Sequence, residues 1–267
     1  PPPGPRAARR RAGLPRGSGG PLTPARAAPR ARGILGSRHF QPCEGGAGQG
    51  LSAWDEAHLA MARAALLSGR PESAVKHLAS ALNPPTTLGE GRHPLANCSR
   101  LYLALGDAHA AAGGELGAQQ AWQTAATFAS DFESMAPAPY SEMTYFSVLA
   151  CRRLGAETAA KELLDGLVDF ADTLRATPAR VDYFATSLPT MLLFAEDIEA
   201  VKDTTVMILD AQVARLRGDR ERAEDLPEGA LRPEPLPGSA RALNRRRPGD
   251  TAPPGARPPP ARPPPAP

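Results

Sequence analysis

The segment from Tyr102 to Ala125 constrains the fold of this chain more than any other stretch. Large and small apolar residues recur at helical spacing on both sides of Gly113, which predicts two antiparallel helices packed face to face. Gly106 and Ala118 allow the two backbones to approach closely, and Trp122 is expected to fill the space beside them. The segment therefore predicts a helical hairpin with a tightly packed interface.

Further helical hairpins are predicted before and after this segment. Each has a glycine between its two helices, where a left-handed residue can end the first helix. Ser52 and Ser141 are expected to cap the first helices of two of these units. The predicted helices are 54–68 and 71–83, 142–154 and 157–173, and 198–217 with a final helix after Gly218.

These hairpins resemble the units of tetratricopeptide repeats, which implies an all-α, TPR-like helical-hairpin solenoid. The matching alanines Ala74, Ala118 and Ala160 are 44 and 42 residues apart, whereas the family's period is about 34 residues. The superhelix is therefore expected to be irregular. Pro227 stands where the first unit has Leu78, and a proline inside a helix costs about 3 kcal/mol. We expect the last helix to be broken or short.

The composition divides the chain into three parts. Residues 1–50 contain nine Pro, eleven Gly and nine Arg against one acid, and residues 232–267 contain thirteen Pro and seven Arg. Such segments bury too little apolar surface to offset the entropy of ordering. Both are predicted to be disordered tails of a helical domain at 51–231.

The net charge of +3 divides into +8 on the first tail, +5 on the second and −10 on the helical domain. The arginines of the tails raise the possibility of binding to a polyanion such as nucleic acid. A coding bias toward GC-rich codons, which favours Arg, Pro, Gly and Ala together, explains the same composition. Nucleic acid is therefore not the expected partner.

The segment 182–197 is the most apolar of the chain and is predicted to form a buried helix that covers the third hairpin. It is too short to span a bilayer, and the chain contains no run of 18 apolar residues, so no membrane association is expected. Because the sequence begins at Pro1 without a methionine, we expect it to be part of a longer protein.

No arrangement typical of catalysis, cofactor binding or metal binding is found in the sequence. Cys43, Cys98 and Cys151 lie far apart without a CxxC pair, which indicates a reducing compartment such as the cytoplasm. The five histidines lack the spacing of metal ligands, and His109 is interpreted as a packing residue. We therefore expect no catalytic residue, cofactor or metal.

In tetratricopeptide proteins, the first helix of each hairpin lines a concave surface where partners bind. Arg152 and Arg153 beside Tyr145 could engage a carboxylate or an aromatic group. The alternative is a solvated face whose arginines are favoured by the C-terminal helix dipole. Arg63 and Asp107 stand where the carboxylate clamp of chaperone-binding members has asparagine, so that activity is not indicated. The candidate groove comprises Arg63, Arg100, Asp107, Tyr145, Arg152, Arg153 and Arg215.

Four stretches, 37–50, 80–97, 130–155 and 182–197, resemble the C-terminal region of large bacterial TPR proteins. Those proteins also carry a β-rich N-terminal domain of unknown function that is similar to mutarotase-type sandwiches. The resemblance implies a TPR-like fold, and it associates the chain with carbohydrate-related proteins only through that N-terminal domain. Cys43 departs from the pattern, which has tryptophan there. No catalytic residue is carried over.

The expected function is a non-catalytic helical repeat module that binds a protein segment or packs against its own N-terminal domain. A second hypothesis is a helical accessory part of a carbohydrate-active enzyme whose β-rich catalytic domain lies upstream. A third is polyanion binding by the arginine-rich tails. The sequence leaves the partner and the oligomeric state open.

Overall fold

The computed structural model describes residues 24–40, 49–128, 130–133, 136–179 and 198–219. This part of the chain is predominantly helical, with one short antiparallel hairpin of two strands. The prediction of a helical chain is confirmed. The elements are α1 Pro24–Ser37, α2 Gln49–Leu67, α3 Pro71–Leu82, the 3₁₀ turn η1 Thr86–Leu88, α4 Ser99–Ala111, α5 Glu115–Ala126, β1 Asp131–Glu133, β2 Ala136–Ala138, α6 Thr144–Arg153, α7 Glu157–Ala176 and α9 Ile198–Arg217.

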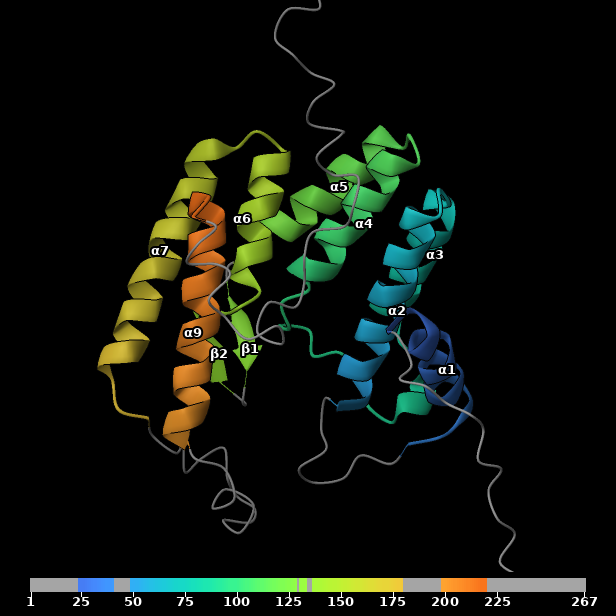
Figure 1. Cartoon of the computed structure of the whole chain (residues 1–267), viewed down its shortest axis with the longest axis horizontal. Helices are drawn as coiled ribbons and strands as arrows, with labels where there is room; N and C mark the ends of the chain where they lie inside the picture. The colour runs from blue at the N-terminus through green and yellow to red at the C-terminus, as the bar shows by residue number, and fades with distance from the viewer. Residues whose placement is uncertain (1–23, 41–48, 129, 134–135, 180–197, 220–267) are drawn as a thin grey trace, which may run out of the picture.

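The helices pack as hairpins that follow one another in chain order (Figure 1). Helix α2 pairs with α3, α4 with α5, and α6 with α7, while α3 contacts α4, α5 contacts α6, and α7 contacts α9. The first helices of neighbouring hairpins also meet, because α4 contacts both α2 and α6. The helices thus contact mainly their partner in the same hairpin and the helices of the next hairpin along the chain.

Glycine ends the first helix of each hairpin, as predicted from the sequence. Gly69, Gly113 and Gly155 follow α2, α4 and α6 with φ angles of 69°, 81° and 74°. Gly218 follows α9 with a φ of 81°. A side chain disfavours this left-handed conformation, which glycine adopts without a steric penalty. The turn positions are thus fixed by the backbone freedom of glycine.

The interface between α4 and α5 matches the close approach predicted for it. A Cβ atom at Gly106 would lie 2.3 Å from Cδ1 of Trp122, so the indole occupies the space that a larger residue would need. Ala118 is buried at the same interface. His109 lies against Gly117, where an added Cβ would come within 2.9 Å of the imidazole Nδ1. The packing role predicted for His109 is confirmed.

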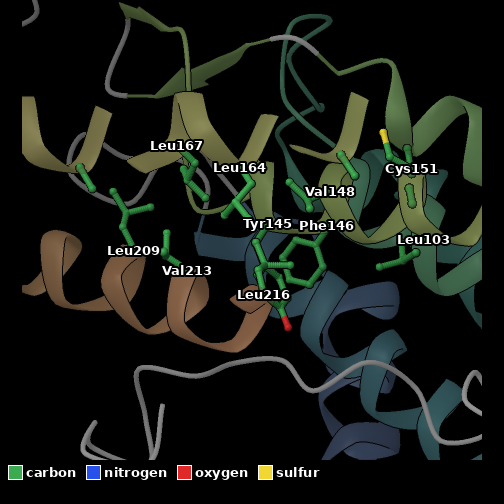
Figure 2. Packing of buried hydrophobic residues seen from close by; sticks show 14 residues of the cluster. Leu103, Tyr145, Phe146, Val148, Cys151, Leu164, Leu167, Leu209, Val213 and Leu216 are labelled. Atoms are coloured by element: carbon green, nitrogen blue, oxygen red, sulfur yellow. The ribbon is translucent and has the colours of Figure 1, made fainter. Parts of the chain in front are cut away.

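The main core lies between α6, α7 and α9, and Figure 2 shows how their side chains meet. Leu209 and Val213 of α9 lie opposite Leu164 and Leu167 of α7, and the ring of Phe146 fills the region beside them. A second cluster joins α2, α3 and α4 and is built largely from alanine and leucine. Small residues at these positions let neighbouring helices approach closely.

Two sequence predictions are wrong at the start of the helical region. Residues 24–37, predicted to be disordered, form helix α1, whose Ala28 packs against Ala57 and Met61 of α2. Helix α2 begins at Gln49, so Ser52 lies inside it and is not its cap. The short side chain of Ala28 allows α1 to pack closely on α2. The composition of the segment does not reveal this contact.

The segment between α5 and α6 contains the two-stranded β1–β2 hairpin. At its end, the backbone N–H of Met143 donates to Oγ of Ser141 at 3.0 Å, but α6 begins at Thr144, so Ser141 lies in the turn before the helix and not at the predicted cap position. The Ser141 N–H donates in turn to Oγ1 of Thr144, also at 3.0 Å. The two bonds fix the entry of the chain into α6.

Several predictions fall outside the described residues. These are the positions 1–23, Cys43, the apolar segment 182–197, Pro227 and the tail 232–267. Among the described helices, none has the length and apolar character that crossing a membrane requires.

Candidate functional site

Three of the seven residues predicted to line an open groove lie inside the protein. Asp107 of α4 accepts a hydrogen bond from Trp122 Nε1 at 3.1 Å and pairs with Arg153 of α6 at 3.0 Å. The side chains of Arg153 and Asp107 are only 9% and 3% exposed. Tyr145 is also buried, within the core of α6, α7 and α9. The prediction of an exposed groove is wrong for these residues, because the hairpins pack across this face.

We call the group of Asp107, Trp122 and Arg153 the Asp107 network. Burial raises the pKa of Asp107, and the charge and hydrogen bond of Arg153 act in the opposite direction. The carboxylate is thus held between the two helices by a partner from each of α5 and α6. Its contacts are all within the protein, so it serves to join neighbouring hairpins.

The other groove residues divide between structural contacts and solvent. Arg152 donates to the carbonyl oxygen of Leu216 at 2.9 Å and thereby satisfies a free carbonyl near the end of α9. Arg215 lies close enough to Tyr145 for its charge to oppose the rise in pKa that burial causes at the phenol. Arg63 is exposed on α2. Arg100 lines a pocket.

That pocket, which we call the α2–α4 pocket, has a volume of about 260 Å³. It lies where α2, the start of α4, the loop before α4 and the residue preceding α6 come together. Consecutive hairpins therefore build it jointly. Its lining residues are Leu51, Ser52, Asp55, Glu56, Leu59, Arg92, Asn97, Cys98, Arg100, Leu101, Asp131 and Met143.

Two arginine–carboxylate pairs form one wall of the α2–α4 pocket. Arg100 binds Glu56 through both terminal nitrogens, at 2.5 and 3.1 Å. Arg92 donates to Asp55 Oδ1 at 2.8 Å and to the carbonyl of Ala81 at 3.1 Å. Each pair joins α2 to the next hairpin or to the loop that leads into it. The guanidinium groups therefore hold the acidic residues at fixed positions beside the cavity.

Asp131 also lines the pocket and is held by two hydrogen bonds. Its Oδ1 accepts from the backbone N–H of Asn97 at 2.9 Å, and its Oδ2 accepts from Ser141 Oγ at 2.8 Å. The Asn97 side chain accepts from the N–H of Ser99 at 2.9 Å, at the first residue of α4. These bonds order the loop before α4. Hydrogen bonds among its lining residues therefore preform the pocket.

Burial raises the pKa of several groups in and near the pocket. It raises the pKa of Asp55, while Arg92 and, more weakly, Arg100 act to lower it. Burial also raises the pKa of Glu142, and the charge of Arg100 opposes this. The pKa of the Cys98 thiol is raised by burial as well, so the group stays protonated at neutral pH and is a poor nucleophile.

The sequence places Arg100 in the groove but does not bring Asp55, Arg92 or Asp131 beside it. Arg92 and Asn97 lie in the segment that connects α3 to α4. Asp55 lies on α2, which the loop residues contact. The spacing within a helix does not reveal which loop residue will fold against it. Among the described residues, no group of three or more His, Cys, Asp or Glu side chains could hold a metal ion.

No protein-family model matches the chain. No solved structure matches it at a significant level either.

Proposed function

We propose that the chain is a TPR-like, non-catalytic helical repeat module that binds a protein segment in the α2–α4 pocket. The observation that carries this proposal is a polar pocket preformed between the first helices of consecutive hairpins. Consecutive helical hairpins and the resemblance to tetratricopeptide repeats support the same interpretation. The partner is a segment of another protein or of an adjoining domain.

The chemistry of the pocket favours binding over catalysis. Its one thiol is buried with a raised pKa, and its two arginines are paired with carboxylates. The lining contains no aromatic ring on which a sugar could stack, which favours a peptide ligand over a carbohydrate. Charged groups at fixed positions beside leucine side chains suit an extended peptide that carries a charged side chain.

Peptide selection from a random library against the full chain tests this proposal. The informative variant is Ser52→Trp, because Ser52 is an exposed residue on α2 that lines the pocket, and an indole there fills the cavity. The matched control is Ala53→Trp, at the next residue of the same helix, which is exposed and does not line the pocket.

We expect selected peptides to lose binding to Ser52→Trp and to keep binding to Ala53→Trp. Circular dichroism confirms that both variants are folded. Peptides that bind the natural chain, Ser52→Trp and Ala53→Trp equally well would show that recognition does not use the α2–α4 pocket. This result would overturn the proposal.

A further inference from the structure

The arginines of the α2–α4 pocket already donate to groups of the protein. Both terminal nitrogens of Arg100 donate to Glu56, and Nη2 of Arg92 donates to Asp55 and to Ala81. The Nε atoms of both arginines are buried, so an incoming group cannot reach them without a rearrangement. An anionic ligand would therefore have to compete with Asp55 and Glu56 for the guanidinium groups.

The carboxylates of the pocket can accept further hydrogen bonds from a ligand. A carboxylate offers about four acceptor positions on its two oxygens, and the Glu56 side chain is 40% exposed. The lining contains the three acidic residues Asp55, Glu56 and Asp131 against two arginines, which leaves a net negative charge. Burial raises the pKa of Asp55, and the guanidinium groups of Arg92 and Arg100 act in the opposite direction.

The size and walls of the pocket limit the shape of the ligand. Its volume of about 260 Å³ is below the roughly 300–1,000 Å³ typical of pockets for drug-sized molecules. Leu51, Leu59, Leu101 and Met143 supply apolar surface beside the charged groups. A long side chain with an aliphatic stem and a cationic end fits both features.

We propose that the α2–α4 pocket binds an arginine side chain of a basic peptide segment, an inference that rests on the proposed binding function. The guanidinium group of the ligand donates to Glu56 and Asp55, and its methylene stem lies on the leucine wall. Arginine is preferred to lysine because its planar fork matches a carboxylate through two bonds.

The arginine has two possible sources. One is the chain's own segment 232–267, which contains seven Arg and a run of three at Arg245–Arg247. Residues 219 to 245 can span up to about 86 Å when extended, which is enough to reach any face of a domain of this size. The other source is a separate protein. Both present the same chemical group to the same carboxylates.

The test uses a fluorescent peptide with the sequence of residues 241–249, RALNRRRPG, titrated with the full chain and followed by fluorescence anisotropy. The control peptides carry citrulline, a neutral isostere, or glutamate at the arginine positions. We expect the citrulline peptide to bind about tenfold more weakly, as the loss of a charge-assisted contact predicts. Equal binding of the citrulline peptide, or tighter binding of the glutamate peptide, would overturn the inference.

The protein variants separate a specific contact from general attraction. Glu56→Gln and Glu162→Gln each remove one negative charge, but Glu162 is an exposed residue of α7 outside the pocket. We expect Glu56→Gln to weaken peptide binding about tenfold and Glu162→Gln to leave it unchanged. Equal weakening in both variants would show that net charge alone attracts the peptide, and it would contradict the inference.

A further variant identifies the source of the arginine. Replacing Arg245, Arg246 and Arg247 by glutamine in the full chain removes the competing run. Tighter binding of the added peptide indicates that the chain's own segment occupies the pocket, and unchanged binding indicates a separate protein.

The inference and the proposed function fail in different ways. If the selected peptides lack arginine but still depend on an open pocket in the Ser52→Trp comparison, the proposed function stands and the arginine inference is wrong. If no peptide depends on the open pocket, both are wrong.

Discussion

The Asp107 network and the α2–α4 pocket contain the same kind of ion pair in different surroundings. Asp107 and Arg153 are 3% and 9% exposed, and Trp122 supplies a further hydrogen bond. Glu56 pairs with Arg100 at least as closely, yet its side chain is 40% exposed and faces a cavity. The first pair is enclosed by packed helices, and the second remains accessible to a ligand.

This comparison shows that the surroundings decide what a charged residue on the first helix of a hairpin does. An enclosed pair has lost its hydration, so removing one partner leaves a buried charge that water cannot reach. A pair at the edge of a cavity keeps part of its hydration, and its removal costs little. The enclosed pair thus specifies how hairpins join, while the accessible pair is free to contribute to recognition.

The largest effect is expected from breaking the Asp107 network. The change Asp107→Leu leaves Arg153 buried without its partner and is expected to lower the free energy of unfolding by about 3–5 kcal/mol. Urea denaturation of the full chain measures this loss. The double variant Asp107→Leu with Arg153→Met should recover most of it, because neither charge is then buried alone. A single variant as stable as the natural chain would contradict the structural role.

The next effect concerns His58, a buried base without the ion partner that Asp107 has. His58 is 1% exposed, and both ring nitrogens lack a hydrogen-bond partner among the described residues. Burial, assisted by the charges of His77 and Arg32, lowers its pKa to about 4 from 6.5. The unfolded chain therefore binds more protons between pH 6.5 and 4, so stability is complete above 6.5 and falls as the pH drops.

The expected loss between these pH values is about 3 kcal/mol. The measurement is the pH dependence of urea unfolding in the natural chain and in His58→Leu, with the exposed residue His93 changed to Gln as a control. The natural chain and the control should lose this contribution on acidification, whereas His58→Leu should not. If the free energy of unfolding depends on pH in the same way in the natural chain, His58→Leu and His93→Gln, the pKa of His58 is the same in the folded and unfolded states.

A smaller effect tests the packing beside the Asp107 network. In Gly106→Ala the new Cβ would lie 2.3 Å from Trp122, whose indole donates to Asp107. Displacement of the ring is expected to cost about 1–3 kcal/mol. The control is Gly33→Ala in α1, where no atom lies within 4 Å of the added Cβ. Thermal unfolding should show a lower Tm only for the first variant, and an unchanged Tm there would argue against this close packing.

The smallest effect on stability is expected at the pocket. Glu56→Gln removes a partly exposed charge and is expected to change the free energy of unfolding by less than about 1 kcal/mol. Urea denaturation beside Asp107→Leu gives the comparison directly. If the pocket variant lost as much stability as the buried one, the division into structural and accessible pairs would be wrong.

The sequence predicted the hairpins well because their signals are local. Gly69, Gly113 and Gly155 mark the turns, and Gly106 with Trp122 specifies the packing of α4 against α5. Each of these signals depends on residues within one hairpin, where spacing along the chain determines proximity. Their agreement with the structure follows from the local character of helices.

The site could not be predicted in the same way, because it depends on contacts between hairpins. Asp107 and Tyr145 have the spacing of an exposed helical face. However, α6 packs against Asp107 and α9 packs against Tyr145, which removes both side chains from solvent. Arg92 and Asp131 come from connecting segments whose course no helical periodicity reveals. Helix α1 was missed because its sequence is rich in proline, glycine and arginine, while its contact with α2 depends on small alanines.

Amide hydrogen exchange of the full chain, with and without a selected peptide, tests most directly whether the pocket rather than the buried network is the recognition surface. The account predicts slower exchange over residues 51–59 and 92–101, which line the pocket, and unchanged exchange over 145–153 in α6. Protection confined to 145–153, or no protection in either region, would contradict it.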